Sequence, residues 1–451
     1  MFTKEELSNF LYDSQGFAEY FSSKYYETHT KVFPLNPFQI LTDLNIHFVF
    51  RNFDGLEGLL MPATEESDAN LVIINAKRPI TRQRFTAAHE LCHFLKDSKL
   101  NPFICLSNSV DRMEKYADRF ASALLMPKDE LKRQIDSRIS VEGQLTLDDV
   151  LIIAEYFGTS FQACSYRISN LFPHVLSAVT KKEREKFKPN KKRAELGLDD
   201  TRLLADMMNA WKDSCYQHNP EFAKQVYKNN YIYNDARIEG VDVNLEATAE
   251  IVEDLQCNRN LSVYCNEEYE NFCHIAGHSL MYDYVFQFDS ATKFDVYKLF
   301  PLNQRLFSCF PNPDYGGRSR TENVLVLGAR FDTVDYRDVM TELSRLNESI
   351  EWLEKNYTRI SLSEIILEIV KIHHRITVIH PFADGNGRTS RAFMNLMFLR
   401  YGVPPVYIRT TNKQEYCNAL EYADKTQNYS KLYEFFLKSI IRAHVELAEQ
   451  P

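Results

Sequence analysis

The sequence lacks the features of several large protein classes. Its nine cysteines are an odd number without paired spacing, which argues against a disulfide framework and against a cysteine-based zinc finger. No apolar run approaches the length that crosses a membrane, and residues 1–6 contain no signal-peptide core. No internal repeat or low-complexity tract is present. These absences predict a soluble protein of a reducing cytoplasm that has no membrane partner.

An excess of positive charge is also missing. The net charge is −9, so bulk attraction to nucleic acid or to an anionic membrane is not expected. Apolar material is plentiful instead, because 44% of the residues are hydrophobic and 13% are aromatic, which is ample for folded cores. The length of 451 residues favours about three domains of ordinary size. Residues 181–193 are rich in Lys and Arg and predict a solvated linker between domains.

The first 175 residues alternate helical and extended patterns. Helices are expected near 10–26, 38–44 and 81–96, and short strands at 46–50 and 71–75. A helical pair follows at 147–171, and its Gly-Thr-Ser junction at 158–160 is typical of a helix-turn-helix. The helix after that junction contains Arg167 as its only cation, so readout of DNA bases is not expected.

The predicted helix at 81–96 contains the pattern His89-Glu90-Leu91-Cys92-His93. Residues four apart share a helix face, so both imidazoles can bind one zinc ion while Glu90 lies beside the bound water. Zinc lowers the pKa of that water, and Glu90 would act as general base on a peptide carbonyl. The alternative is a His-rich helix with a surface glutamate and no metal.

The flanking residues are similar to the ImmA/IrrE family of zinc metallopeptidases. Residues 84–88, Arg-Phe-Thr-Ala-Ala, precede the histidines, and 114–121 with Leu-Leu-Met-Pro at 124–127 follow them. The resemblance covers residues 1–175 and implies an α+β zincin-like domain with a small sheet. It also implies Glu114 as the third zinc ligand, with Asp118 as a weaker candidate, and a transcriptional repressor as a possible peptidase substrate. Cys92 replaces the usual Gly and Asp118 the usual Asn, so a sensing or purely structural metal domain stays open as an alternative.

A second chemical cluster lies at residues 380–391, His-Pro-Phe-Ala-Asp-Gly-Asn-Gly-Arg-Thr-Ser-Arg. The preceding helix begins with a capping-box pattern at Ser361 and Glu364 and ends at Pro381. Gly385 and Gly387 permit a turn that exposes N–H groups at the start of the next helix, which makes an anion site. Two arginines three residues apart, Arg388 and Arg391, add positive charge to it, and Asp384 offers oxygen ligands to Mg²⁺. No Gly-Lys-Ser/Thr follows the glycines, so this is not a P-loop.

These residues match the Fic motif, His-x-Phe-x-Asp/Glu-Gly-Asn-Gly-Arg-x-x-Arg, at every fixed position. The resemblance implies transfer of AMP from ATP to a Tyr, Thr or Ser hydroxyl of a target protein. His380 would be the general base, and Asp384 would hold Mg²⁺ at the phosphates. Phosphate binding is expected from the following residues: Gly385, Asn386, Gly387, Arg388 and Arg391.

Three further segments resemble parts of Fic proteins. Residues 233–240 end in Glu239 and Gly240, similar to an inhibitory helix whose glutamate pairs with the second motif arginine, here Arg391; Asp235 stands where Ser or Thr is usual. Residues 317–328 predict a β-hairpin flap that clamps the target by main-chain pairing. The flap residues expected to do so are Arg320, Thr321, Glu322, Asn323 and Val324. Tyr416 is a candidate to stack on adenine, with a core aromatic as the equal alternative.

Together these patterns predict a metallopeptidase-like domain at 1–175, a basic linker at 176–198 and a mostly helical Fic domain at 199–451. The predicted function is an adenylyltransferase that is inhibited by Glu239 and fused to a zinc peptidase. The alternative is a regulator or sensor of the ImmA/IrrE type that binds or cleaves a repressor, with the Fic domain secondary or using another nucleotide.

Overall fold

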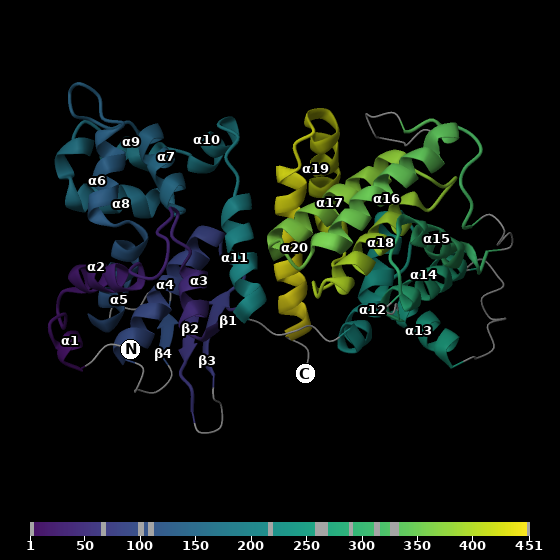
Figure 1. Cartoon of the computed structure of the whole chain (residues 1–451), viewed down its shortest axis with the longest axis horizontal. Helices are drawn as coiled ribbons and strands as arrows, with labels where there is room; N and C mark the ends of the chain where they lie inside the picture. The colour runs from purple at the N-terminus through teal and green to yellow at the C-terminus, as the bar shows by residue number, and fades with distance from the viewer. Residues whose placement is uncertain are drawn as a thin grey trace. The chain divides into compact units, whose positions relative to one another are not determined.

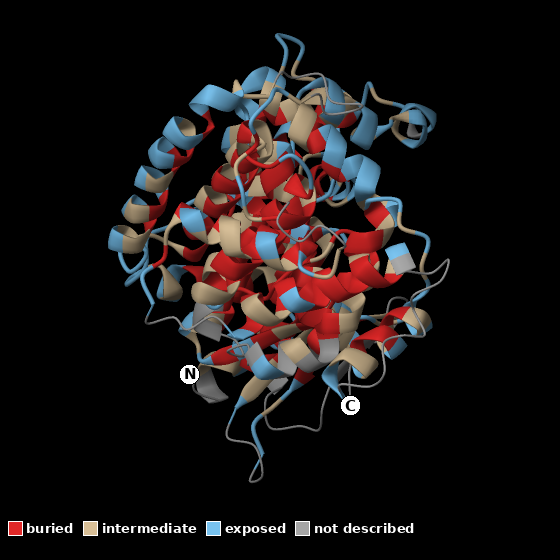
Figure 2. Cartoon of the chain, turned by 90° about the vertical axis from the view of Figure 1, so that its right-hand side faces the viewer, coloured by how far each residue is buried: buried red, intermediate tan, exposed pale blue. Residues whose placement is uncertain are grey.

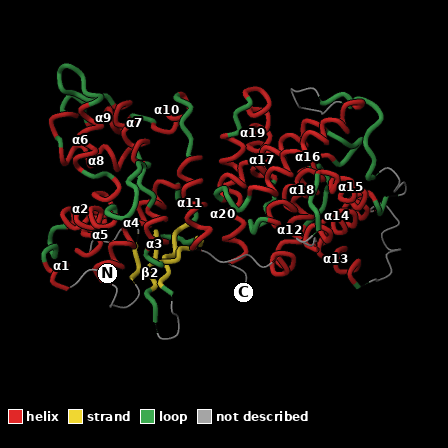
Figure 3. The backbone as a smooth tube through the Cα atoms, viewed as in Figure 1, coloured by secondary structure: helices red, strands yellow, loops and turns green. Residues whose placement is uncertain are grey.

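The chain forms two compact units, with the boundary between Cys215 and Tyr216 (Figure 1). A computed structural model of the chain describes residues 4–64, 69–97, 103–106, 112–214, 220–257, 269–287, 292–310, 316–324 and 333–448. Within those ranges all of the strands lie in the first unit, and the second unit is helical (Figure 3). The predicted fold class is confirmed: an α+β unit with a small sheet precedes a mostly α-helical one.

The first unit is built on a four-stranded sheet in the order β1-β3-β2-β4. β1 (Ile46–Arg51) runs parallel to β3 (Asn70–Asn75), and β2 (Leu56–Met61) runs antiparallel to both β3 and β4 (Phe103–Leu106). Both predicted strands are confirmed, but β2 lies in a stretch for which no strand was predicted. Its sequence, Leu-Glu-Gly-Leu-Leu-Met, has no β-branched residue, so pairing on both sides rather than local propensity makes it a strand.

Helix α4 (Ile80–Asp97) packs on β2 and β3 and against α5 (Arg112–Leu125). Arg84 of α4 is fully buried and donates hydrogen bonds to the carbonyls of Leu35, Phe157 and Gly158, which join three distant segments. These contacts satisfy a charge that burial would otherwise make costly. The side of α4 that carries the histidines is therefore placed with little freedom.

A second helical layer follows α5. α7 (Leu147–Phe157) begins with a capping box between Thr146 and Asp149 and ends at Gly158, whose φ is 61°. α8 (Phe161–Leu171) then begins at the N-cap Ser160, so the expected helix-turn-helix junction is present. The other helices of this unit are α1 (Lys4–Ser8), α2 (Ser14–Tyr25), α3 (Pro37–Asp43), α6 (Lys128–Asp136), α9 (Lys181–Lys186), α10 (Pro189–Glu195) and α11 (Thr201–Ser214).

The segment at 176–198, expected as a linker, contains the short helices α9 and α10. Arg193 of α10 forms ion pairs with Glu155 of α7 and with Asp200, and Lys192 forms one with Asp148. The domain boundaries expected from the sequence stay predictions; the structure places this basic segment within the first compact unit.

The second unit is arranged around α18 (Asn386–Arg400), nearly all of whose residues are buried. Figure 2 colours the chain by residue burial, with buried residues in red. α17 (Leu362–Ile379), α14 (Tyr269–Gln287) and α15 (Leu299–Phe307) pack directly against it. The remaining helices are α12 (Pro220–Ile238), α13 (Leu245–Gln256), α16 (Val339–Asn356), α19 (Lys413–Thr426) and α20 (Ser430–Ala448). None of the helices in the described ranges is long and apolar enough to cross a membrane.

Candidate active sites

The junction between α17 and α18 holds His380. α17 begins with the predicted capping box, in which Ser361 and Glu364 bond each other's backbone N–H groups. It ends at His380, whose φ is 53°, a left-handed conformation that is strained for a residue with a Cβ. Pro381 has no N–H group and does not continue the helix. The half-buried His380 side chain is therefore placed at the point where the chain turns from one helix to the next.

The imidazole of His380 is oriented by its own helix. Nδ1 lies 3.3 Å from the carbonyl oxygen of Thr377. A carbonyl only accepts, so Nδ1 carries the proton and Nε2 keeps its lone pair. Burial lowers the pKa of His380, against the opposing effect of its hydrogen bond to the Thr377 carbonyl, so the neutral form is favoured near neutral pH. These are the properties of a general base.

Arg320, expected in the target-clamping flap, is buried and serves this junction instead. Its guanidinium donates to the carbonyl oxygen of His380 at 2.7 Å, and its backbone N–H donates to that of Pro381 at 2.9 Å. It also donates to the carbonyls of Glu322 and Val334. The Arg320 side chain is therefore used within this junction, and the clamping role expected for its main chain stays a prediction.

The rest of the predicted flap is only partly within the described residues. Thr321, Glu322 and Asn323 are exposed, and Val324 accepts a hydrogen bond from Thr333 Oγ1 at 3.0 Å. Residues 325–328 of the predicted hairpin lie outside the described residues. The flap's role in target binding stays a prediction for these four residues.

The turn at 382–386 is closed by side chains. Asn386 accepts from the N–H of Phe382 at 2.9 Å and donates to its carbonyl at 2.7 Å, so its amide is used within the turn. Asn303 of α15 donates to the carbonyl of Asp384 and to Thr389 Oγ1, both at 3.1 Å. The sequence reading expected the Asn386 amide to contact a phosphate, whereas the structure shows it shaping the turn.

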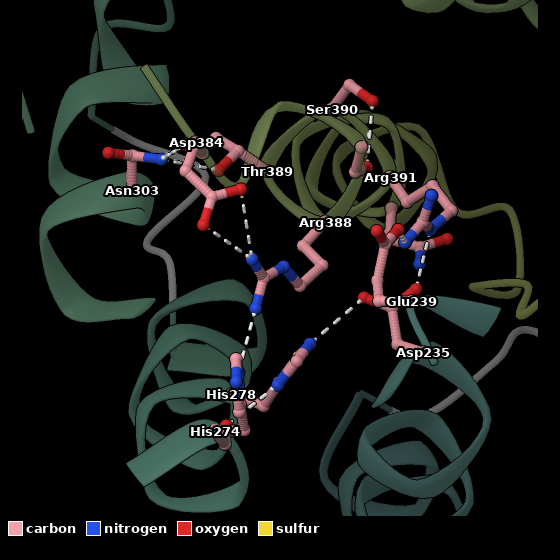
Figure 4. Close-up of polar contacts among 12 residues, drawn as sticks. Asp235, Glu239, His274, His278, Asn303, Asp384, Arg388, Thr389, Ser390 and Arg391 are labelled. Atoms are coloured by element: carbon pink, nitrogen blue, oxygen red, sulfur yellow. Dashed lines mark hydrogen bonds and ion pairs between the residues drawn. The ribbon is translucent and has the colours of Figure 1, made fainter. Parts of the chain in front are cut away.

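The first turn of α18 has the geometry of an anion-binding site. Gly385 is the N-cap with φ of 75°, and it provides no side chain to cap the helix N-terminus. Arg388 is buried, and its Nη2 lies 3.4 Å from both carboxylate oxygens of Asp384 (Figure 4). Its Nη1 donates to Nδ1 of His274 at 3.1 Å. Burial, with the nearby charge of Arg388, lowers the pKa of His274 to about 4, so this imidazole is neutral and can accept.

Arg391 is held by two carboxylates from α12 and its C-terminal end (Figure 4). Its Nε donates to Asp235 Oδ1 at 2.5 Å, and its Nη2 donates to Glu239 Oε1 at 2.6 Å. Burial raises the pKa of each carboxyl, but the charge of Arg391 outweighs burial, so the pKa of both Asp235 and Glu239 is lowered. Both carboxylates are therefore ionised near neutral pH, and Arg391 is fully paired.

Gly387 makes room for this arrangement. A Cβ at this position would lie 3.0 Å from both Arg391 Nη1 and Glu239 Oε1.

The two carboxylates differ in their surroundings. Asp235 also faces His278 of α14, whose Nε2 lies 3.5 Å from Asp235 Oδ2. Glu239 is the more accessible of the two carboxylates, since its side chain is 35% exposed and that of Asp235 only 4%.

Tyr416 of α19 lies in the core. It is 5% exposed, its hydroxyl is 2.8 Å from His373 Nε2, and its ring packs on Phe435 and Phe436. This is the core aromatic that the sequence left open as the alternative to adenine stacking.

The first unit brings together the predicted zinc ligands. His89 Nε2 lies 3.1 Å from His93 Nε2 and 3.2 Å from Glu114 Oε2, and His93 Nε2 lies 3.3 Å from Glu114 Oε1. One ligand atom from each residue falls within 4.8 Å of the other two. Two imidazoles and a carboxylate are a typical zinc donor set, so these residues fit that metal.

Glu90 lies beside this cluster and is completely buried. Neither of its carboxylate oxygens has a hydrogen-bond partner among the described residues, and burial raises its pKa to about 7. An unsatisfied buried carboxylate is costly, which is the pattern expected where a metal-bound water completes the site.

Asp118 and Cys92 are not among the clustered ligand atoms of the described chain. Asp118 Oδ1 lies 3.0 Å from Nδ1 of His89, on the opposite edge of the ring from Nε2. It therefore orients the imidazole in the way that outer-shell carboxylates orient metal ligands. Cys92 is buried in the core side of α4.

Four functional contacts were not found from the sequence: those of Asn303, His274, His278 and the inward Arg320. Asn303 interrupts an apolar helical pattern, and the two histidines are four residues apart on α14, so each left a weak signal. The partners of Asn303, His274 and His278, and the His380 carbonyl that Arg320 bonds, lie between 43 and 114 residues away in the chain, which local patterns do not reveal.

Comparison with known protein families finds one match in each unit. Residues 41–169 match the model of the IrrE N-terminal-like domain, a peptidase family, and residues 293–398 match that of the Fic/DOC family. The chain therefore carries one domain of each kind, as the sequence motifs indicated.

Curated relatives share the second of these domains. Protein adenylyltransferase fic-1 of Caenorhabditis elegans is 34% identical over 113 residues, which are 25% of this chain and 21% of that protein. Protein adenylyltransferase Fic of Drosophila willistoni is 28% identical over 232 residues, 51% of this chain and 44% of that protein. The chain thus spans less than half the length of either relative. A solved structure of Fic-1 from C. elegans aligns with 81% of this chain and 97% of its own, with a TM-score of 0.43 and 17% identity.

Proposed function

We propose that the second unit is a protein adenylyltransferase that transfers AMP from ATP to a Tyr, Thr or Ser hydroxyl of a target protein. The observation that carries the proposal is the junction of α17 and α18, where a neutral imidazole, an exposed carboxylate, an uncapped helix N-terminus and two arginines converge. The match to the Fic/DOC family and the adenylyltransferase relatives support it.

In this reaction His380 Nε2 accepts the proton of the target hydroxyl. The hydroxyl oxygen forms a bond to the α-phosphorus of ATP as the bond from that phosphorus to the bridging oxygen breaks, and pyrophosphate leaves. The first N–H groups of α18, with Arg388, stabilise the charge that develops on the phosphates. Asp384 would hold Mg²⁺, because its carboxylate is largely exposed beside this anion site; the ion would neutralise phosphate charge.

The same geometry supports autoinhibition by Glu239. Arg391 is the arginine expected on the outer phosphates, and its Nη2 and Nε are already occupied by Glu239 and Asp235. A bound triphosphate would have to compete with two ionised carboxylates for one guanidinium. Because Glu239 follows the end of α12 and is partly exposed, it is the carboxylate that can move away without unfolding a helix.

The test is incubation of the full chain with ATP and Mg²⁺, followed by intact-mass measurement of AMP adducts. We expect self-modification to increase at least tenfold in Glu239→Gly and to vanish in Glu239→Gly/His380→Ala. Asp242→Gly is the matched control, because Asp242 is fully exposed near the same helix end and does not contact Arg391. An adduct that is equal in wild type and Glu239→Gly would refute the inhibitory role, and one that survives His380→Ala would refute the assigned base.

For the first unit we propose a zinc metallopeptidase centre. His89, His93 and Glu114 would hold the ion, which when bound supplies an acidic water and polarises a peptide carbonyl. Glu90 would accept the proton of that water, since its carboxylate is unpaired and its pKa is raised toward neutrality by burial. Asp118 keeps His89 in the tautomer that presents Nε2.

A second reading of this unit is a regulator that binds or cleaves a transcriptional repressor, with the Fic domain secondary or using another nucleotide. The buried and unpaired Glu90 favours catalysis over a purely structural metal. Metal analysis of the purified chain should find one zinc per molecule, and none in His93→Ala. Proteolysis of a candidate repressor that is lost in Glu90→Gln, with zinc retained, would establish the peptidase; zinc without proteolysis would favour the sensor.

A further inference from the structure

A cleft lies in the first unit outside both sites described above. It has a volume of about 910 Å³ and is lined by the start of α2, the first turns of α4, the outer face of α5 and one face along the whole length of α8. We call it the α8 cleft. Its size is in the range of small-molecule sites rather than of an ordinary packing void.

Arg167 of α8 lines this cleft although it is only 8% exposed. Its Nε donates to the carbonyl of Met126 at 2.7 Å, which fixes the side chain, while its Nη2 has no hydrogen-bond partner among the described residues. No carboxylate in the described chain forms an ion pair with it; the nearby Glu19 acts on it only at longer range. A buried guanidinium in this state is expected to be balanced by an anion.

Other cations of the cleft lie on the outer face of α5 and on α4, where Arg82 forms an ion pair with Glu57. Lys115 and Arg119 are both exposed. The two carboxylates that line the cleft are used elsewhere, because Asp13 accepts from the N–H of Gly16 to cap α2, and Asp118 is bonded to His89. Among the described lining residues, Lys115, Arg119 and Arg167 outnumber the two carboxylates, so the net field in the cleft is positive.

The start of α8 adds to that field. Thr159 and the N-cap Ser160 line the cleft, so the positive end of the dipole of this 11-residue helix faces it. Apolar surface lies next to the charges, since Tyr12, Phe85 and Tyr166 also line the cleft. Tyr12 and Tyr166 are largely exposed, as expected for side chains that cover a ligand rather than a core.

The cleft is distinct from the metal cluster. His89, Glu90, His93 and Glu114 do not line it. Asp118 is the connection between the two, because it lines the cleft and contacts His89 at Nδ1, the ring edge that faces away from the clustered ligand atoms.

We propose that the α8 cleft binds a small organic anion whose phosphate or carboxylate group pairs with Arg167 at the start of α8 and whose ring lies against Tyr12, Phe85 and Tyr166. Such a site makes the first unit a ligand-binding unit in addition to any peptidase activity. The ligand would contact Asp118, and Asp118 in turn contacts His89 of the metal cluster.

The test is calorimetric titration of the full chain with two probes, phenyl phosphate and benzoate, which separate the phosphate from the carboxylate form of the ligand. The second unit has its own anion site at Arg388 and Arg391, so all titrations are repeated in Arg388→Ala/Arg391→Ala. We expect one binding site for one of the probes to persist in that variant. Adding Arg167→Gln to it should abolish this site.

Lys115→Gln/Arg119→Gln keeps the test decisive if Arg167→Gln does not fold, because both residues are exposed. Placed in the same double-alanine chain, it should weaken the dissociation constant at least fivefold, while Lys132→Gln, an exposed cation on α6 outside the cleft, leaves it unchanged. The proposal is overturned if Arg388→Ala/Arg391→Ala removes all binding of both probes. It is equally overturned if Lys115→Gln/Arg119→Gln binds like its parent.

Discussion

Arg391 is the residue on which the proposed control of the second unit depends. Its guanidinium is buried between Asp235 and Glu239, and the three groups form a charge-assisted network that excludes other anions from that side of Arg391. Removing one carboxylate leaves the other in place, so the network can open at Glu239 while Asp235 still orients Nε. We therefore expect Glu239 to act through its charge rather than through its bulk.

Glu239→Gln tests this distinction. The amide keeps the shape and one hydrogen bond but loses the charge that pairs with Arg391. We expect AMP transfer in this variant to lie between wild type and Glu239→Gly, when all three are measured at the same ATP concentration. Activity equal to wild type would mean that Glu239 acts by filling space.

The pH profile of Glu239→Gly is a second prediction at this scale. Burial lowers the pKa of His380, so the base is already neutral above its ordinary value of about 6.5. Transfer should therefore be flat from pH 6.5 to 8 and fall only at lower pH, as His380 becomes protonated. A rate that continues to rise tenfold between pH 6.5 and 7.5 contradicts the assignment.

The carboxylates do not interfere with that measurement. The pKa values of Asp235 and Glu239 are lowered in the folded protein, so their ion pairs with Arg391 stabilise the fold above the unfolded values of about 4. This stabilisation is lost only as the pH falls through the lowered folded values. In Glu239→Gly only the pair between Asp235 and Arg391 remains, and it is thus constant across the range in which His380 is titrated.

At the scale of elements, the segment that contains Arg320 supports the end of α17. Five hydrogen bonds from this one side chain reach carbonyls and one amide oxygen, among them the carbonyl of His380, whose backbone is in a left-handed conformation. A planar fork with fixed donors suits this task, and a lysine ammonium does not reproduce it. The arginine therefore positions the proposed base without contacting the substrate.

Arg320→Lys in the Glu239→Gly chain should lower the rate of AMP transfer at least tenfold. We expect nucleotide binding, measured by calorimetry, to change less than threefold, because the anion site at α18 is not altered. Arg318→Lys, an exposed position two residues earlier, serves as the matched control. A tenfold loss of nucleotide affinity would show that Arg320 supports the whole junction and not His380 in particular.

At the scale of the molecule, each of the two compact units has its own core and its own candidate site. The metal cluster links α4 to α5 in the first unit, so a bound ion would stabilise that unit by mass action. A metal at one hundred times its dissociation constant contributes about 2.7 kcal/mol.

Removal of the metal should consequently lower the first thermal transition of the full chain by several degrees. The comparison is calorimetry with and without a chelator, in wild type and in His93→Ala. The chelator should have no effect in His93→Ala, which has lost a ligand. An equal chelator effect in both proteins would place the stabilising metal elsewhere in the chain.

Residue patterns alone determined the fold class and pointed to the main residues proposed for both sites. The helix spacing of His89 and His93, the capping box at Ser361 and the glycine turn before Arg388 are local, because each depends on neighbours within a few residues. The glutamate at the end of α12 was also visible as a helix terminus. Such local signals can be recognised in a sequence because backbone torsions and helix faces are determined by residues that are close in the chain.

Tertiary structure decided which side chains face one another. It turned Arg320 inward to the carbonyl of His380, used the amide of Asn386 inside the turn, put Tyr416 in the core and made Leu56–Met61 a strand. It also buried Arg167, the only cation of the helix after the Gly-Thr-Ser junction, at a cleft of the first unit. These outcomes depend on burial and on partners tens of residues away in the chain. The packing energies that decide them arise from contacts between distant segments, so no short stretch of sequence predicts them.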